Sequence, residues 1–240
     1  TAAVQDLCEE LDISEGFLLT IPQRQMASSM AAACEGWKAR LDTAEEMQAF
    51  GEAAAELDAD IEDHARRPGG TLLNELRAIA HEVGDAQALA ANDSKFELLH
   101  RHLAEYWRQH PGKKVVLFSF YRATLYYLQR RLARGGVQAV VLHGGMDKQQ
   151  ALEHFERPDG PHILLSSEVA SEGVDLQFSS LLVNYDLPWN PAKIEQRIGR
   201  IDRIGQQEEQ ILIWNLVYED SIDDRVYERL LERLGAFRQA

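Results

Sequence analysis

The second half of the chain alternates short apolar runs with longer stretches of helical periodicity. The stretches Tyr121–Arg134 and Lys148–Phe155 have the spacing and composition of helices. Alternation of this kind predicts a parallel sheet with helices on both faces, and in such sheets ligands bind outside the carboxyl ends of the strands. We therefore expect functional residues at the edge where the strands end. The predicted strands, each followed by small or polar residues, are Val115–Phe118, Ala139–Leu142, Ile163–Leu165 and Leu181–Tyr185.

The first part of the chain has a different, helical pattern. An acidic stretch at Thr43–Arg66 is rich in Ala and Glu and stops before Pro68, which is followed by two glycines. A further helical stretch at Ser94–His110 ends at Pro111. The pattern therefore predicts an acidic α-helical segment before the sheet. A last strand and a closing helix are predicted at Ile211–Val217 and Ser221–Arg238.

The negative charge of the chain belongs almost entirely to its first part. Of the net charge of -14, residues 1–94 contribute -13, from 6 Lys and Arg against 19 Asp and Glu, whereas residues 95–240 carry 19 against 20. Because local potential decides what a groove attracts, the acidic total does not exclude an anionic ligand for the second part. The acidic helices are an insertion, an interaction surface or a solvated arm, and the sequence leaves these alternatives open.

The run QRIGRIDRIGQ at Gln196–Gln206 carries the strongest chemical signal. On a helix, residues 196, 200 and 203 share one face, so Arg200 and Arg203 can project together. A guanidinium is always charged and binds phosphate oxygens through two parallel N–H groups. The spacing therefore indicates a phosphate-binding pair, which we expect at the carboxyl edge of the sheet. The alternative is a solvated basic helix face.

This run and four blocks before it resemble the second RecA-like lobe of superfamily 2 helicases and translocases, specifically the Swi/Snf branch. The ending RIGQ at Arg203–Gln206 is similar to Swi/Snf proteins, whereas DEAD-box RNA helicases usually read HRxGRxxR, from which Gln196 departs. Bacterial RNA-polymerase-associated ATPases and related Swi/Snf-like proteins are the most similar. The other blocks are VVLFSFYRATLYYL at Val115–Leu128, LHGGM at Leu142–Met146, LLSSEVASEGVDL at Leu164–Leu176 and NYDLPWNP at Asn184–Pro191.

The resemblance implies an ATP site shared between two lobes. In that family the first lobe holds the phosphates and Mg²⁺, and the second supplies arginines to the γ-phosphate, which Arg200 and Arg203 match. Gly173 and Asp175 match a motif of the family in which the glycine allows close backbone approach and the carboxylate accepts a hydrogen bond from a ribose hydroxyl. Further nucleotide contacts are expected from Glu172, Gln196 and Arg197.

The resemblance also implies a nucleic-acid track along the same sheet edge, made by contacts to phosphates without base readout. For His143 the alternative is a histidine whose hydrogen bonds are satisfied by the backbone at a strand end. The family implies double-stranded DNA tracked along one strand, although the spacing alone does not separate DNA from RNA. The residues expected to form the track are Ser119, Arg122, His143, Ser166 and Ser167.

The sequence contains no GxxxxGK[ST] phosphate loop and no acidic box after a strand. We therefore expect the second half of an ATPase, inactive alone, with ATP and Mg²⁺ held mainly by the first RecA-like lobe of the same protein. The segment Ile21–Trp37 resembles the linker that follows that first lobe. The predicted domains are an inter-lobe linker at 1–40, an acidic helical segment at 41–94 and a helicase C-terminal lobe at 95–240.

The remaining features of the composition narrow the class further. Cys8 and Cys34 are far apart and form no CxxC pair, so neither a metal site nor a disulfide framework is expected. No apolar run approaches the roughly 20 residues that span a bilayer, and we expect a cytoplasmic protein without membrane contact. The alternatives to a DNA motor are an RNA helicase lobe and a degenerate lobe that binds a protein such as RNA polymerase.

Overall fold

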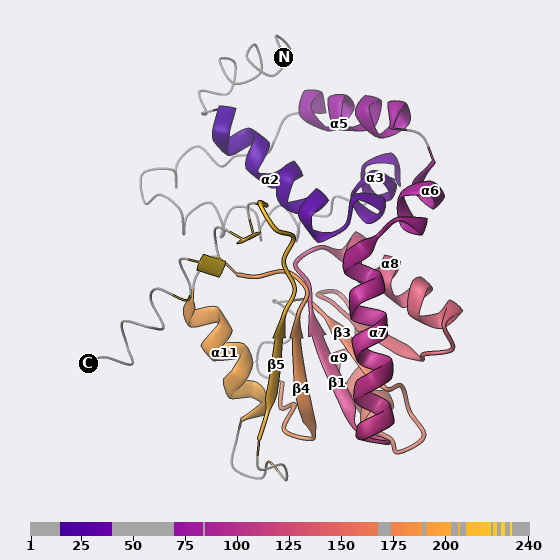
Figure 1. Cartoon of the computed structure of the whole chain (residues 1–240), viewed down its shortest axis with the longest axis vertical. Helices are drawn as coiled ribbons and strands as arrows, with labels where there is room; N and C mark the ends of the chain where they lie inside the picture. The colour runs from indigo at the N-terminus through magenta and orange to yellow at the C-terminus, as the bar shows by residue number, and fades with distance from the viewer. Residues whose placement is uncertain are drawn as a thin grey trace, which may run out of the picture. The chain divides into compact units, whose positions relative to one another are not determined.

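The computed structural model divides the chain into two compact units, Thr1–Asp93 and Ser94–Ala240 (Figure 1). Among the described residues no helix is long and apolar enough to cross a membrane. The structure describes residues 15–39, 70–83, 85–167, 174–188, 191–202, 206, 210–221, 223–224, 227–228 and 231.

The described part of the first unit consists of four helices. α3 packs against the other three, and it buries Ala32, Cys34 and Trp37. The indole N–H of Trp37 donates to Oε1 of Gln25 at 2.7 Å, which ties α3 to α2. The acidic stretch predicted at Thr43–Arg66 lies outside the described residues. The helices are α2 (Glu15–Ser28), α3 (Met30–Ala39), α5 (Gly70–Glu82) and α6 (Ala86–Ala91).

The second unit is an α/β domain built on a parallel sheet of five strands, which confirms the predicted fold class. The strand order is β2-β3-β1-β4-β5, and every pair in it is parallel. The strands are β1 (Lys114–Phe118), β2 (Ala139–Leu142), β3 (Ile163–Ser166), β4 (Ser179–Asn184) and β5 (Leu212–Asn215). The helices are α7 (Ser94–Gln109), α8 (Arg122–Arg134), α9 (Lys148–Glu156) and α11 (Pro191–Ile201). Most of the predicted closing helix lies outside the described residues.

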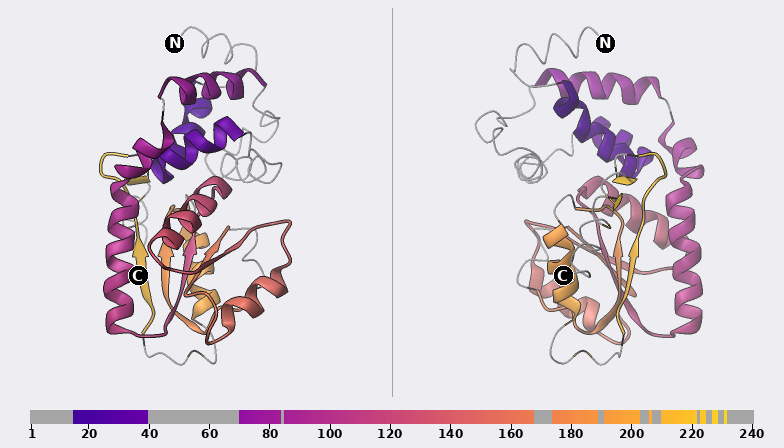
Figure 2. Two further views of the ribbon diagram at one scale, coloured as in Figure 1. Left: turned by 90° about the vertical axis from the view of Figure 1, so that its right-hand side faces the viewer. Right: turned by 60° about the vertical axis from the view of Figure 1, so that its left-hand side comes forward.

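The sheet is covered on both faces. On one face α7 contacts β4 and β5, where the hydroxyl of Tyr106 lies 2.9 Å from Oγ of Ser180 and its ring lies edge-on to Trp214. α8 lies on the same face, because Phe96 of α7 packs edge-on against Tyr127 of α8. Figure 2 shows α7 on one side of the sheet and α9 on the other.

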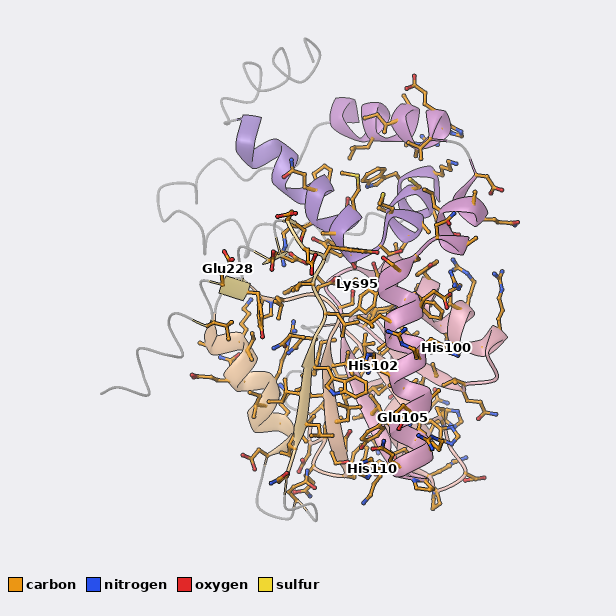
Figure 3. The ribbon with its side chains drawn as sticks, in the orientation of Figure 1. Lys95, His100, His102, Glu105, His110 and Glu228 are labelled. Atoms are coloured by element: carbon orange, nitrogen blue, oxygen red, sulfur yellow. The ribbon has the colours of Figure 1, made fainter. Side chains whose placement is uncertain are left out.

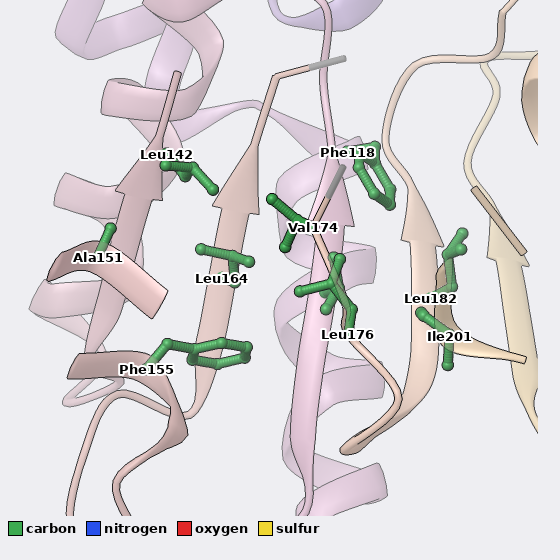
Figure 4. Packing of buried hydrophobic residues seen from close by; sticks show 10 residues of the cluster. Phe118, Leu142, Ala151, Phe155, Leu164, Val174, Leu176, Leu182 and Ile201 are labelled. Atoms are coloured by element: carbon green, nitrogen blue, oxygen red, sulfur yellow. The ribbon is translucent and has the colours of Figure 1, made fainter. Parts of the chain in front are cut away.

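Alternate side chains of the strands form a core on the face that carries α9 and α11. Val116 and Phe118 of β1 point to this face, and the segment that precedes β4 lies over it (Figure 4). The cluster joins β1, β2, β3 and β4 to both helices, which fixes α11 against the sheet. Its buried members are Val116, Phe118, Leu142, Ala151, Phe155, Leu164, Val174, Leu176, Leu182 and Ile201.

The loop after α9 is fastened at the amino end of β1. The Lys114 ammonium donates to the carbonyl groups of Arg157 at 2.8 Å, Gly160 at 3.2 Å and Pro161 at 2.9 Å. At Gly160 a Cβ atom would lie 2.2 Å from the carbonyl oxygen of His154, so only glycine fits there. These hydrogen bonds hold the loop that connects α9 to β3 against the amino end of β1.

Candidate nucleotide and nucleic-acid site

The last turn of α11 holds the described member of the predicted arginine pair. The carbonyl oxygen of Arg200 accepts a hydrogen bond from the backbone N–H of Leu176 at 3.0 Å. The exposed Asp175 and the half-buried Arg200 are therefore brought together from separate elements. Oδ1 of Asp175 also accepts from the backbone N–H of Gln177 at 3.2 Å, which holds this segment in a turn.

This pair does not lie at the carboxyl edge of the sheet, and our placement of Arg200 there was wrong. α11 connects the parallel strands β4 and β5, so it must run back from the carboxyl edge toward the amino edge. The side-chain amide of Gln206 donates to the carbonyl groups of Ser179, which opens β4, and Ile201, which ends α11. Figure 4 shows Leu176 and Ile201 well below Phe118 along the strands. The phosphate-binding role of Arg200 stays a prediction.

The other predicted nucleotide contacts differ in what surrounds them. Gln196 and Gly199 are exposed on α11, and a Cβ atom added at Gly199 would meet nothing within 4 Å. A glycine inside a helix costs about 1 kcal/mol relative to alanine, and no packing within the described part of the lobe requires it here. Arg203, Glu172 and Gly173 lie outside the described residues.

Arg197 is fully buried in the lobe. Its Nη1 donates to Oδ1 of Asn184 at 2.6 Å and to the carbonyl oxygen of Asp186 at 3.1 Å. The guanidinium also lies over the rings of Phe118 and Phe120, 4.9 Å and 5.3 Å from their centroids. These contacts give Arg197 a packing role between α11, β4 and β1, and the predicted contact with nucleotide stays a prediction.

A buried polar network fills the carboxyl ends of β1 and β4. Oδ2 of Asp186 accepts from the hydroxyl of Ser119 at 2.5 Å and from the backbone N–H of Phe120 at 3.1 Å. The Lys95 ammonium lies 3.8 Å from Oδ1 of the same carboxylate and 4.6 Å from the ring centroid of Tyr185. Lys95 and Asp186 are both buried. Figure 3 shows Lys95 in the first turn of α7.

This network occupies the topological switch point of the sheet, because α8 leaves β1 on one face and α11 leaves β4 on the other. Open parallel sheets usually bind ligands there. Here Lys95, Ser119 and Asp186 are all buried at this position. Lys95 and Asp186 were not predicted as partners from the sequence, since only the pairing of β1 with β4 brings α7 and the end of β4 together.

The predicted nucleic-acid residues lie at neighbouring strand ends, as expected. Ser119 follows β1, His143 follows β2, and Ser166 and Ser167 lie at the end of β3. All four side chains are buried. The hydroxyl of Ser166 donates to the carbonyl oxygen of Ser167 at 3.1 Å, and the hydroxyl of Ser119 is used by Asp186. Direct phosphate contacts by these hydroxyls stay predictions.

Arg122 and His143 form a separate cluster with Tyr126 on the β2 side of this edge. Arg122 is the first residue of α8 and is half-buried. Its Nη2 lies 3.3 Å from Nε2 of His143, and the hydroxyl of Tyr126 lies 2.7 Å from the same nitrogen. Arg122 is thus the charged member of the predicted track that retains solvent exposure. Tyr126 was missed because nothing in the sequence pairs it with His143.

The second unit is similar in sequence to helicase C-terminal domains. Residues 94–205 match the family described as helicase conserved C-terminal domain. The chain is 38% identical over 128 residues to a Bacillus subtilis protein named uncharacterized ATP-dependent helicase YqhH, a match that covers 52% of this chain and 23% of that protein. It is 44% identical over 110 residues to the RNA polymerase-associated protein RapA of Photobacterium profundum, covering 44% of this chain and 11% of RapA.

A solved structure shows the same fold. The C-terminal part of the Fun30 ATPase domain superposes with a TM-score of 0.53 at 19% identity, covering 76% of this chain and 63% of that one. The chain spans less than a quarter of the length of the curated relatives that it matches. Residues 94–205 form a C-terminal helicase lobe, as the sequence predicted.

Proposed function

We propose that this chain contains the second motor lobe of an ATP-dependent translocase or helicase of the Swi/Snf type that acts on double-stranded DNA. The observation that carries the proposal is the backbone hydrogen bond between Leu176 and Arg200. It joins the backbones of two blocks of the predicted nucleotide site that are separate in sequence, the one that contains Asp175 and the one that contains Arg200. A packing role alone does not require this pair to remain at least partly exposed.

The residues of this pair fit a nucleotide held with Mg²⁺ mainly by the first RecA-like lobe of the same protein. The guanidinium of Arg200, with that of Arg203, would face the γ-phosphate, and Asp175 would accept from the ribose. The space above Gly199 allows a phosphate or a neighbouring lobe to approach the helix backbone closely. When bound, ATP supplies the phosphoryl group whose transfer to water drives opening and closing of the two lobes.

The nucleic-acid track would lie on the carboxyl edge, at the ends of β1, β2 and β3. Arg122 supports this proposal, because it is a half-buried cation at the N-terminal end of α8, where the helix dipole also favours an anion. Nucleotide and nucleic acid would therefore contact different ends of the same lobe. Movement of the lobe upon hydrolysis would then be transmitted to the nucleic acid.

The similarity to a protein named for its association with RNA polymerase supports a recruiting partner of that kind. We propose a cytoplasmic protein that reaches DNA through such a partner. A pull-down with purified RNA polymerase tests this part of the proposal separately from motor activity.

The experiment for the motor is ATP turnover by a protein in which this chain follows its own first lobe. We expect turnover that double-stranded DNA stimulates more strongly than single-stranded RNA, and no turnover by the 240-residue chain alone. Displacement of a third strand from a DNA triplex would separate translocation from simple ATPase activity. Stimulation by RNA alone would favour an RNA helicase lobe, and absence of any nucleic-acid stimulation would contradict the proposal.

A further inference from the structure

Both ring nitrogens of the buried His143 have partners within the lobe. Nδ1 lies 2.6 Å from the carbonyl oxygen of Gly144. Nε2 lies 2.7 Å from the hydroxyl of Tyr126 and 3.3 Å from Nη2 of Arg122. The ring is also edge-on to that of Tyr126, with centroids 5.7 Å apart and an interplanar angle of 70°. The position of the imidazole is therefore fixed from two elements, the end of β2 and the first turns of α8.

These contacts determine where the proton of His143 resides. A carbonyl oxygen can only accept, so Nδ1 carries the hydrogen. A guanidinium can only donate, so Nε2 must offer its lone pair to Arg122, and the Tyr126 hydroxyl donates to the same lone pair. A protonated ring would turn an N–H toward the guanidinium and add a second positive charge beside it. The contact between Nε2 and Arg122 thus favours an imidazole with its hydrogen on Nδ1 and the lone pair of Nε2 facing the guanidinium.

We propose that His143 is a positioning residue, which with Tyr126 holds the Arg122 guanidinium at the carboxyl edge and acts on nucleic acid only through it. Arg122 and Tyr126 are one helical turn apart, so both reach the same imidazole nitrogen. Holding a long side chain in place before binding reduces the entropy lost on binding. The inference rests on the proposed nucleic-acid track for the role of Arg122, but the hydrogen-bonding pattern that it requires can be measured without nucleic acid.

The first test is ¹⁵N NMR of the 240-residue chain labelled at histidine. We expect the spectrum of a neutral Nδ1–H tautomer for His143, and a shift of its Nε2 resonance in Tyr126→Phe and in Arg122→Ala. His154, exposed on α9, should not respond to either change. A neutral ring with its hydrogen on Nε2, or a charged ring at neutral pH, would overturn the assignment.

The second test is a double-mutant cycle on binding to a DNA duplex. His143→Phe keeps a ring of similar shape but removes both nitrogens, whereas His143→Gln restores an acceptor near the position of Nε2. Arg122→Ala and His143→Phe should each reduce the slope of log binding constant against log salt concentration by about 1. The double variant should bind no more weakly than Arg122→Ala. His143→Gln should recover part of the loss, and His154→Phe serves as the control.

The outcomes separate this inference from the proposed function. If His143→Phe weakens binding by the same factor with and without Arg122, His143 contacts the nucleic acid itself and the positioning role is refuted. If Arg122→Ala changes neither the affinity for the duplex nor its salt dependence, Arg122 does not contact nucleic acid. The positioning role of His143 in binding is then refuted as well. Unfolding curves of all variants show whether the lobe remains folded.

Discussion

Replacement of Arg197 by methionine should destabilise the lobe strongly, because this guanidinium lies in its interior. The change leaves Oδ1 of Asn184 and the carbonyl oxygen of Asp186 without a donor, at 2.6 Å and 3.1 Å from where Nη1 stood. Each buried acceptor left unsatisfied costs about 1–3 kcal/mol. The stacking on Phe118 and Phe120 is partly retained by the methionine thioether. With two acceptors left unsatisfied, we therefore expect a loss of about 2–6 kcal/mol in the free energy of unfolding.

The assay is urea unfolding combined with hydrogen exchange of β1 and β4, because exchange reports on this unit separately from Thr1–Asp93. Arg134→Met, on the exposed end of α8, is the matched control and should change stability by no more than about 0.5 kcal/mol. The loss of stability in Arg197→Lys should lie between those of Arg197→Met and Arg134→Met, since an ammonium lacks the planar set of N–H donors of a guanidinium. A loss below about 1 kcal/mol for Arg197→Met would refute the buried placement, and Arg197 would again be a candidate for nucleotide contact.

Two glycines should respond to alanine in opposite ways, and thermal unfolding of the two variants tests the close packing of one loop. Gly160→Ala places a Cβ atom 2.2 Å from the carbonyl oxygen of His154 and should destabilise the lobe, whereas Gly199→Ala meets nothing within 4 Å and should stabilise α11 by up to about 1 kcal/mol. An equal change in unfolding temperature for Gly160→Ala and Gly199→Ala would show that the loop after α9 shifts to accommodate the added Cβ atom. In the first unit, burial raises the pKa of the Cys34 thiol. Alkylation of Cys34 should therefore be slow in the native chain and rapid in urea. Mass spectrometry of the peptide that contains Cys34 measures both rates. Rapid alkylation of the native chain would show that Cys34 of α3 is exposed.

The strands and helices of the lobe could be predicted from the sequence because the apolar runs are continuous and the helices between them are amphipathic. The run at Val115–Phe118 is buried at every position, as expected for the central strand of a parallel sheet. The predicted track residues at the ends of β1, β2 and β3 also lie at one edge, since parallel strands end together.

What the sequence could not provide is the environment of each polar side chain. Arg197 and Arg200 lie in the same run of α11, yet one is fully buried and the other half-buried, because the face of the helix that meets β4 is fixed by packing. The partnership of Lys95 with Asp186 depends on the pairing of β1 with β4, which local patterns do not specify. Because α11 connects two parallel strands, its last turn must lie toward the amino edge of the sheet. The prediction that placed Arg200 at the carboxyl edge did not take this direction into account.

The central claim is that Arg200 acts on the nucleotide from the second lobe, and the most direct test is the kcat of ATP hydrolysis by the two-lobe protein. Arg200→Ala and Arg203→Ala should each lower kcat at least about 10²-fold, while ATP and DNA binding change little, because the guanidinium acts on charge that develops in the transition state. Arg134→Ala should keep the unaltered rate. Normal turnover in both Arg200→Ala and Arg203→Ala would contradict the account.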